Sequence, residues 1–413
     1  MNHDDLIYDW NRLPPSHDYA ATTVELNDET LRDGLQNPSV TDPPIEKKIE
    51  LLHLMVELGI HSADIGLPGA GPRAYEACLA LAREIADTGL PIDVTLAART
   101  VRADIEPVAR IQEESGLKLE VATFIGSSPI RQYAEDWDVE RILDATRGAI
   151  EFAVSEGLDV MYVTEDTTRS RPRTLTRLFS AAVEAGARRI CLADTVGHAT
   201  PHGVRRLVRF AKDFAAGTGE PVKIDWHGHR DRGLGLANAL AAIEEGVDRV
   251  HATALGIGER IGNVEMDLLL VNLHLLGTHD HPIDRLADYC RVTAEMCGID
   301  IPYNYPVIGD DAFRTGTGVH AAAIIKAMQK GDRWLEDCVY SGVPASLVGR
   351  SQIIEVSPVS GLSNVRHWLS HHGYDADDEA LCTAVFRLAK KCNHTLSRGE
   401  IESEIARVQA ERT

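Results

Sequence analysis

Residues 159–194 read DVMYVTEDTTRSRPRTLTRLFSAAVEAGARRICLAD and contain one complete β-α-β unit. The β-branched run Asp159–Glu165 predicts a strand, Leu175–Ala185 repeats apolar residues at helical spacing, and Gly186 stops that helix. Arg188–Asp194 predicts the next strand. A strand, a helix and a second strand in this order predict two parallel strands joined by a crossover helix.

The same alternation extends in both directions along the chain. Six further strand candidates are Thr23–Asn27, His61–Gly66, Ile92–Arg99, Lys118–Phe124, Val222–His229 and Arg249–Gly256, with helical patterns such as Pro44–Leu58 between them. Eight units within about 235 residues favour a closed barrel over an open doubly wound sheet. The first strand-helix loop also lacks the Gly-x-Gly-x-x-Gly turn of a dinucleotide-binding fold. We therefore predict an α/β fold, a (β/α)8 TIM barrel over residues 1–280 with a short N-terminal extension, followed by a mainly helical C-terminal subdomain over residues 281–413.

Composition and charge exclude several classes of protein. The net charge of −21 argues against nucleic-acid binding, because a phosphate backbone would be repelled. No apolar run approaches the ~20 residues that span a membrane, and the acidic, proline-broken start MNHDDLIYDWNRLPP does not resemble a secretory signal. The seven cysteines lie far apart without a Cys-x-x-Cys pair, which is typical of reduced thiols. We expect a cytoplasmic enzyme without nucleic-acid or membrane partners.

The residues that stand out, all of them polar except Pro68, end or follow the predicted strands. They are Arg32 and Asp33, Pro68, Arg99, Glu165 and Asp166, Asp194 and Thr195, His227 and His229, and Glu259 and Asn263. In a barrel the carboxyl ends of all strands converge on one rim, where active sites of this fold are built. A second concentration of charge, Arg169-Ser-Arg171-Pro-Arg173, fits either an anionic substrate or a solvated loop.

His227 and His229 form the strongest candidate for a metal site. Two residues apart on a strand, both imidazoles face the same side, and Asp33 comes from a strand only two places away around the barrel. Two imidazoles and a carboxylate leave open positions on a divalent ion, and Asn263 could add an oxygen ligand. Mixed nitrogen and oxygen ligands suit Mn, Mg, Co or Zn. The alternative is a hydrogen-bonded pair of core histidines.

Two neighbouring features each allow two interpretations. Arg32 beside a metal would stabilise the alkoxide that forms from a ketone, or it would pair with a rim carboxylate. The glycine-rich loop GIGERIGN, residues 256–263, would bind the phosphates of CoA or make a tight turn that orients Asn263.

Together these segments resemble the 2-isopropylmalate synthase/homocitrate synthase family, metal-dependent barrels related to the HMG-CoA lyases. The matching motifs are ETLRDG (29–34), DIGLP (64–68), TEDTTR (164–169), DTVG (194–197), HGHRDRGLGLANALAA (227–242), GIGERIGN (256–263), PVIGDDAF (306–313) and GVH (318–320). The resemblance covers roughly residues 22–370. Several long motifs in the same order make it specific.

The resemblance implies a Claisen-type condensation of acetyl-CoA with a 2-oxo acid, giving a 2-alkylmalate-type product and CoA. Asp33, His227 and His229 would hold the metal, with Asn263 near it. Arg32 would steady the alkoxide and Thr195 would bind the substrate carboxylate. His320 would help to deprotonate the acetyl group, aided by Glu165 and Tyr340. In the family this histidine comes from the partner subunit, so the C-terminal subdomain would contribute to a homodimer and to its active site.

The chain departs from the family pattern at several positions. Asp64 stands where the family usually has Glu, Leu35 where Glu is common, and Arg230 where Asn is frequent. The lyases carry a Cys in the loop after the eighth strand, where this chain has Glu259-Arg260, so we favour a synthase over a lyase or aldolase. The chain ends where longer isopropylmalate synthases continue into a regulatory domain, so we expect no leucine-type feedback inhibition. A barrel that only binds a ligand is a further alternative.

The identity of the 2-oxo acid has two interpretations. Leu67 and the small residues Gly69-Ala-Gly71 suit a branched aliphatic group, as in 2-oxoisovalerate. Arg131 would instead pair with a second anionic group, as in 2-oxoglutarate, oxaloacetate or a phosphonate or phosphinate analogue of pyruvate. That would make the enzyme a homocitrate, citrate or phosphono- or phosphinomethylmalate synthase. Asp64 and Arg99, at the ends of the second and third strands, complete the candidate substrate-binding residues.

Overall fold

The computed structural model describes residues 6–12 and 17–412. Parts of the segment that we expect not to be a secretory signal, residues 1–5 and 13–15, lie outside the described residues. The chain divides into two compact units, one up to Pro282 together with Asp288–Ile299, and one comprising Ile283–Ala287 and the chain from Asp300 onward.

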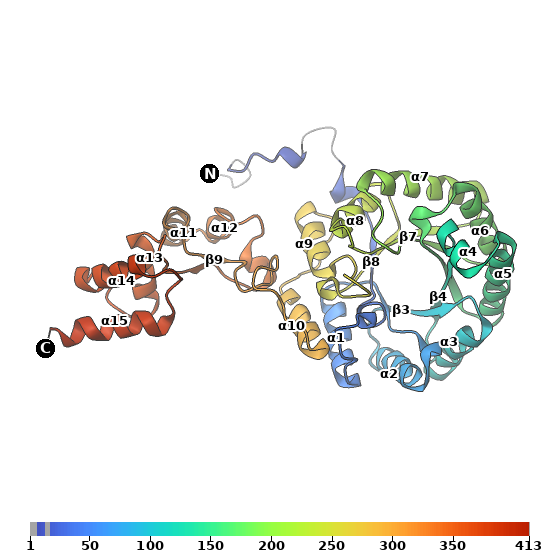
Figure 1. Cartoon of the computed structure of the whole chain (residues 1–413), viewed down its shortest axis with the longest axis horizontal. Coiled ribbons are helices and arrows are strands. Elements are labelled where there is room, and N and C mark those ends of the chain that lie inside the picture. The colour runs from blue at the N-terminus through green and yellow to red at the C-terminus, as the bar shows by residue number, and fades with distance from the viewer. Residues whose placement is uncertain (1–5, 13–16, 413) are drawn as a thin grey trace. The chain divides into compact units, whose positions relative to one another are not determined.

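Eight parallel strands close into a barrel in the first unit (Figure 1). Each strand pairs with its neighbours in chain order, and β1 closes the barrel by pairing with β8 from Glu25↔Arg249 to Asp28↔Ala252. The strands are β1 (Glu25–Asp28), β2 (Ser62–Asp64), β3 (Asp93–Arg99), β4 (Leu119–Gly126), β5 (Asp159–Glu165), β6 (Arg189–Asp194), β7 (Lys223–Gly228) and β8 (Arg249–Ala252). The predicted TIM barrel is confirmed.

Helices surround this barrel on its outer face (Figure 1). They are α1 (Ile45–Glu57), α2 (Pro72–Thr88), α3 (Arg102–Ser115), α5 (Val139–Ser155), α6 (Pro172–Ala185), α7 (Pro201–Thr218), α8 (Gly235–Glu244), α9 (Met266–Leu276) and α10 (Leu286–Cys297). The short helix α4 (Pro129–Glu135) follows β4 and has no buried residue. Helix α6 is typical: Leu175, Leu178 and Phe179 are fully buried, and Gly186 ends the helix with φ 116°. An apolar stripe at helical spacing therefore packs α6 onto the barrel, as its sequence predicts.

Two strands are shorter than their sequences predict. The residues expected to continue β8 instead form a 3-10 turn, η7 (Ala254–Gly256), in which Leu255 has φ 55° and Gly256 has φ 61°. Strand β2 ends at Asp64, before Gly66 with φ 145°. Left-handed backbone cannot continue a β ladder, so the chain turns earlier than its β-branched composition suggests.

The barrel interior is arranged in layers because side chains at alternate strand positions face inward. One layer is apolar, with Ala122, Met161 and Cys191 buried together. Another is ionic, in which Arg189 Nη1 and Arg249 Nε each lie 2.7 Å from Asp225. The barrel interior thus holds two arginine cations, and the carboxylate of Asp225 pairs directly with both.

The second unit is mainly helical. Its elements are β9 (Arg314–Thr315), α11 (Gly318–Lys330), α12 (Arg333–Cys338), the 3-10 helix η8 (Ala345–Val348), β10 (Ile353–Ile354), α13 (Leu362–His371), α14 (Glu379–Lys391) and α15 (Arg398–Ala410). Strands β9 and β10 pair in parallel. Asp378 caps α14 as its sequence suggests, and Leu381 and Val385 enter a buried cluster around Trp368.

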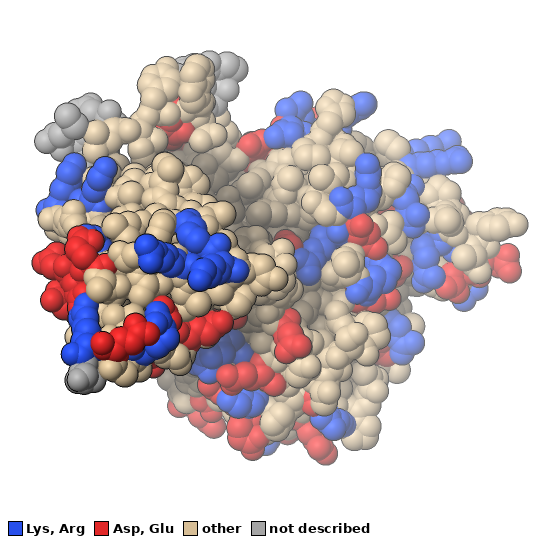
Figure 2. All heavy atoms as spheres, turned by 60° about the vertical axis from the view of Figure 1, so that its left-hand side comes forward, with Lys and Arg blue, Asp and Glu red and all other residues tan. Residues whose placement is uncertain are grey.

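The surface carries both signs of charge. Figure 2 shows Asp and Glu side chains interspersed with Lys and Arg over the face that it presents. Across residues 6–12 and 17–412, no helix has both the length and the apolar character needed to cross a bilayer. All seven cysteines are free thiols.

Candidate active site

Asp33, His227 and His229 meet at the carboxyl end of the barrel strands. Asp33 lies in the turn after β1, His227 lies on β7, and His229 follows that strand. The Nε2 atoms of both histidines lie 3.5 Å from Asp33 Oδ2. All three residues are buried, and their donor atoms can surround one ion. Ligand atoms at this spacing suit an ion with bonds of about 2.0–2.2 Å.

Several buried polar atoms around this triad lack hydrogen-bond partners. They are Asp33 Oδ1, His229 Nδ1 and Asn263 Oδ1. Buried polar atoms are almost always hydrogen-bonded, so unpaired atoms gathered at one place need an explanation. Burial is the largest of the causes that hold the pKa of His229 down at about 4, so its ring is neutral at pH 7, as a metal ligand must be. The donor set and its unpaired oxygens fit a divalent cation.

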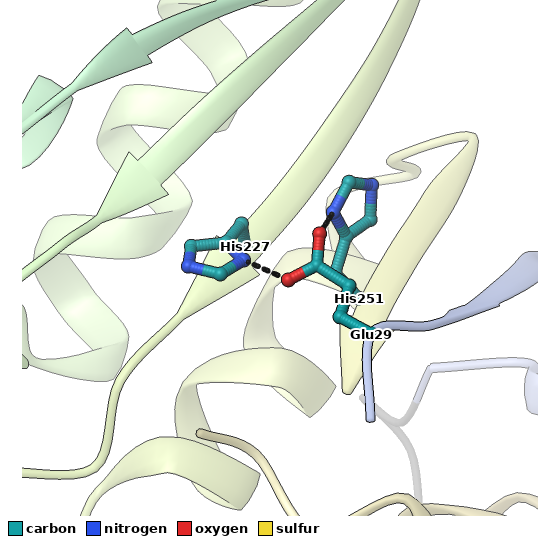
Figure 3. Close-up of side chains that lie close together, drawn as sticks. All are labelled: Glu29, His227 and His251. Carbon is teal, nitrogen blue, oxygen red and sulfur yellow. Dashed lines mark hydrogen bonds and ion pairs between the residues drawn. The ribbon is translucent and has the colours of Figure 1, made fainter. Parts of the chain in front are cut away.

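Glu29, His227 and His251 form a second triad that shares one histidine with the first (Figure 3). Here Glu29 accepts hydrogen bonds of 2.8 Å from His227 Nδ1 and from His251 Nδ1. Contacts this short are direct hydrogen bonds and leave no room for an ion between them. The Glu29/His227/His251 triad is therefore held together by direct hydrogen bonds, whereas the Asp33/His227/His229 triad has the spacing for a cation between its members.

His251 is held between two carboxylates. Its Nδ1 faces Glu29 and its Nε2 lies 3.0 Å from Asp225 Oδ2. Burial lowers the pKa of His251, but Glu29 and Asp225 outweigh burial and raise it overall. Because carboxylates only accept, both ring nitrogens donate and the ring is an imidazolium. Glu29, His251 and Asp225 were not among the site residues predicted from the sequence, although the alternate spacing of His251 with Arg249 and of Asp225 with His227 marks inward-facing positions.

Arg32 lies among three carboxylates. Its guanidinium is 2.8 Å from Glu29, 3.3 Å from Asp33 and 3.0 Å from Asp64. Burial raises the pKa of Asp64 to about 7 in spite of the neighbouring Arg32. The predicted residues Arg32, Asp33 and Asp64 are thus brought together, with Arg32 at the edge of the metal triad.

Glu165 ends β5, Arg131 lies on α4 and Thr195 follows β6, all at the same rim. Burial raises the pKa of Glu165, an effect that Arg131, 3.2 Å away, partly opposes. Arg131 also pairs with Glu135 at 2.9 Å. Thr195 Oγ1 accepts a hydrogen bond of 2.8 Å from the Asp166 backbone, which leaves the hydroxyl proton to donate elsewhere.

A cavity of about 220 Å³ opens above the metal triad. Its charged and polar lining is Glu29, Arg32, Asp33, Gln36, Glu165, Thr195, His227, His229, His251 and Glu259, and its other lining residues are Leu67, Ala97, Ala122, Phe124, Met161, Val163, Cys191 and Ala193. Arg99 does not line it: its exposed guanidinium binds both carboxylate oxygens of Asp104, at 2.7 and 2.8 Å. The triad therefore lines a small, half-apolar cavity.

The glycine-rich loop after β8 is wound closely around Asn263. Asn263 Nδ2 donates to Ile257 O at 3.3 Å, and its backbone N–H donates to Gly256 O at 3.1 Å. A Cβ on Gly258 would lie 2.1 Å from Asn263 Nδ2, and one on Gly262 would lie 1.9 Å from Gly256 O. These close approaches favour the interpretation in which the glycines orient Asn263 beside His229.

His320 and Tyr340 belong to the second unit. His320 lies in the first turn of α11, and its ring stacks on Tyr340 with centroids 4.0 Å apart. Both side chains are exposed within that unit. The two predicted catalytic residues are thus a contacting pair.

A larger cavity of about 600 Å³ lies between α6 and α7 and is lined by Pro172, Leu175, His198, Arg206 and Phe210, among others. It contains none of the candidate metal ligands. The nearby arginine-rich segment is paired or solvated: Arg169 binds Asp166 with both Nε and Nη2, while Arg171 and Arg173 are exposed. This supports the solvated-loop interpretation of that segment.

Comparisons with known proteins agree with this geometry. The chain is 32% identical over 359 residues to the homocitrate synthase AksA of Methanopyrus kandleri, covering 86% of this chain and 84% of that protein. It is 30% identical over 361 residues to the 2-isopropylmalate synthase of Sulfolobus acidocaldarius, covering 87% and 88%. Both relatives are named as synthases, in agreement with the class of enzyme that the sequence motifs predict.

The barrel also resembles a solved structure. The HMG-CoA lyase of Bacillus subtilis superposes with a TM-score of 0.57 at 20% identity, covering 68% of this chain and 96% of that chain. At this identity the likeness concerns the fold alone. The model of the HMGL-like family matches residues 23–293, which include the whole barrel and the metal triad. The chain therefore belongs to the HMGL-like family, and its relatives include 2-isopropylmalate and homocitrate synthases.

Proposed function

We propose that this enzyme condenses acetyl-CoA with a 2-oxo acid to give a 2-alkylmalate-type product and free CoA. The observation that carries the proposal is the open Asp33/His227/His229 triad in the lining of a half-apolar cavity, with Arg32 beside it. A divalent ion, Mn, Mg, Co or Zn, bound there would polarise the ketone of the 2-oxo acid. The names of the relatives agree with this chemistry.

The side chains of this enzyme divide the remaining work. The Thr195 hydroxyl donates to the carboxylate of the 2-oxo acid, and the Arg32 guanidinium stabilises the alkoxide that develops as the new carbon–carbon bond forms. Glu165, whose pKa burial raises above its usual value, is suited to accept and release a proton. His320, with Tyr340 stacked on it, removes the proton from the acetyl methyl group. Hydrolysis of the resulting thioester releases CoA.

The cavity lining favours an uncharged aliphatic 2-oxo acid such as 2-oxoisovalerate. Leu67, Phe124 and Val163 offer apolar contacts, and small residues beside them leave space. Arg131, the candidate for a second anionic group, already pairs with Glu165 and Glu135. A homocitrate-type reaction is the second candidate, since Arg131 would have to exchange these partners for a substrate carboxylate.

The direct test is thiol release from acetyl-CoA with a panel of 2-oxo acids, with Mn²⁺ and with a chelator. We expect metal-dependent release, fastest with 2-oxoisovalerate. Arg131→Ala is the diagnostic variant: if Arg131 binds the distal carboxylate, the substitution lowers kcat/KM for 2-oxoglutarate about 10-fold or more beyond its effect, through Glu165, on an aliphatic acid. Cleavage of a 3-hydroxyacyl-CoA without release of CoA thiol from acetyl-CoA would instead indicate a lyase.

We also propose that the enzyme is a cytoplasmic homodimer in which the subdomain from residue 281 onward supplies His320 to the active site of the partner subunit. The free thiols support a reducing compartment. If sites are shared, mixing inactive His320→Ala with inactive Asp33→Ala should restore activity toward about a quarter of wild type, because one site of each mixed dimer is intact. Mixtures that stay inactive after subunit exchange would exclude shared sites.

A further inference from the structure

We propose that His251 and Asp225 are positioning residues that act through Glu29 to fix the orientation and tautomer of the metal ligand His227. The inference rests on the proposed metal site and does not depend on which 2-oxo acid is used.

The contacts form an unbroken line from His227 to Asp225, of which Figure 3 draws the two contacts made by Glu29. His227 Nδ1 lies 2.8 Å from Glu29 Oε2, Glu29 Oε1 lies 2.8 Å from His251 Nδ1, and His251 Nε2 lies 3.0 Å from Asp225 Oδ2. Both carboxylates can only accept, so the direction of every hydrogen bond is determined. His227 must carry its proton on Nδ1, and its Nε2 lone pair therefore faces Asp33.

The line is anchored at its lower end. Asp225 binds Arg249 Nε and Arg189 Nη1, each at 2.7 Å, and it is fully buried. Asp225 and His227 occupy alternate positions on β7, as Arg249 and His251 do on β8. Because every member is a buried side chain on a barrel strand or directly after one, the line holds Glu29, and through it the imidazole, with little freedom to rotate.

A purely structural role makes a different prediction. If His251 only balanced buried charge, its loss would lower stability without changing the affinity of the folded protein for a metal. A positioning role lowers metal affinity itself, since outer partners of a ligating histidine typically contribute 10–100-fold to it.

The experiment is a Mn²⁺ titration of the purified, metal-stripped full chain without substrate. His251→Gln and Asp225→Asn should bind Mn²⁺ about 10–100-fold more weakly than wild type. The matched control is Glu25→Gln, which removes a carboxylate bound to Arg189 and Lys223, at 3.0 and 2.7 Å, but not part of the line to His227. The control should keep wild-type affinity.

Wild-type Mn²⁺ affinity in folded His251→Gln overturns the inference, as does an equal loss of affinity in Glu25→Gln. If His251→Gln does not fold, Asp225→Asn, which conserves side-chain shape, decides in the same way. The proposed function can fail separately: a chain that shows this pattern of affinities but condenses no 2-oxo acid keeps the inference and loses the reaction. A wild-type chain that binds no Mn²⁺ overturns both.

Discussion

Buried charged and polar residues at the two ends of the barrel interior differ in whether their hydrogen-bond and ion-pair partners are complete. In the ionic layer, Asp225, Arg189 and Arg249 are buried and each has direct partners of opposite charge. At the carboxyl end, Asp33 and His229 are equally buried, but Asp33 Oδ1 and His229 Nδ1 have no hydrogen-bond partner. Burial is the same in both places, and only the pairing differs.

The difference teaches how to separate a structural charge from a functional one. A buried charge whose partners are complete adds little net stability, but removing one partner leaves the other charge buried with its full desolvation cost. A buried polar group without a hydrogen-bond partner lowers the stability of the fold, and that stability is recovered only when a bound ligand supplies the missing partner. Substitutions at the two ends should therefore affect different measurements.

The largest effect is expected on turnover at the carboxyl end. His229→Ala should lower kcat/KM for thiol release by at least about 10⁴-fold, equivalent to about 5.5 kcal/mol, because the ion loses a ligand. Its free energy of unfolding, measured with urea in the presence of a chelator, should fall by no more than about 2 kcal/mol. A variant that keeps full turnover would exclude His229 as a ligand.

The next effect is on stability in the ionic layer. Arg249→Met should lower the free energy of unfolding by about 3–5 kcal/mol, because Asp225 and Glu120 lose a buried partner. Arg398→Met is the control: it breaks an exposed pair with Glu402, and should change stability by less than about 0.5 kcal/mol. Equal effects of the two substitutions on the urea midpoint would contradict the expected difference in stability between a buried and an exposed ion pair.

The smallest effect concerns the pH dependence of stability near the metal triad. Burial raises the pKa of Asp64 to about 7, so between about pH 4 and pH 7 the folded metal-free chain binds more protons at this site than the unfolded chain does. Its contribution to stability therefore falls as pH rises through that window, by at most about 1.4 kcal/mol per pH unit. Asp64→Asn should remove this slope in urea titrations at several pH values; an unchanged slope would assign it to other groups.

The sequence predicted the barrel and the members of the open triad, because both follow from periodicity. Eight strand-helix alternations define the barrel, and His227 and His229 share a face because side chains alternate along a strand. The same periodicity marks Asp225 and His251 as inward-facing, but a single sequence does not tell which inward residues find partners. The hydrogen-bonded triad of Glu29, His227 and His251 could therefore be recognised only from the interatomic distances in the structure.

Other features depend on contacts that local sequence does not encode. Arg99 ends β3 at the rim, yet Asp104 captures its guanidinium outside the cavity. Arg131 could be recognised as a cation near the site, but its pairing with Glu135 and Glu165 required the fold. The turn after β8 depends on left-handed Leu255, a conformation that its side chain disfavours and that neighbouring hydrogen bonds must impose.

The pairing of β1 with β8 has a consequence for how the protein acquires its function. Asp33 comes from the first strand-helix connection, whereas its two partners come from the seventh strand and the residue after it, so they meet only when the ends of the sheet join. During synthesis, a nascent chain that lacks β7 and β8 would contain only Asp33 of the three candidate ligands. If a cation binds there as proposed, its binding would require a completed barrel, and an unfinished chain would not retain it.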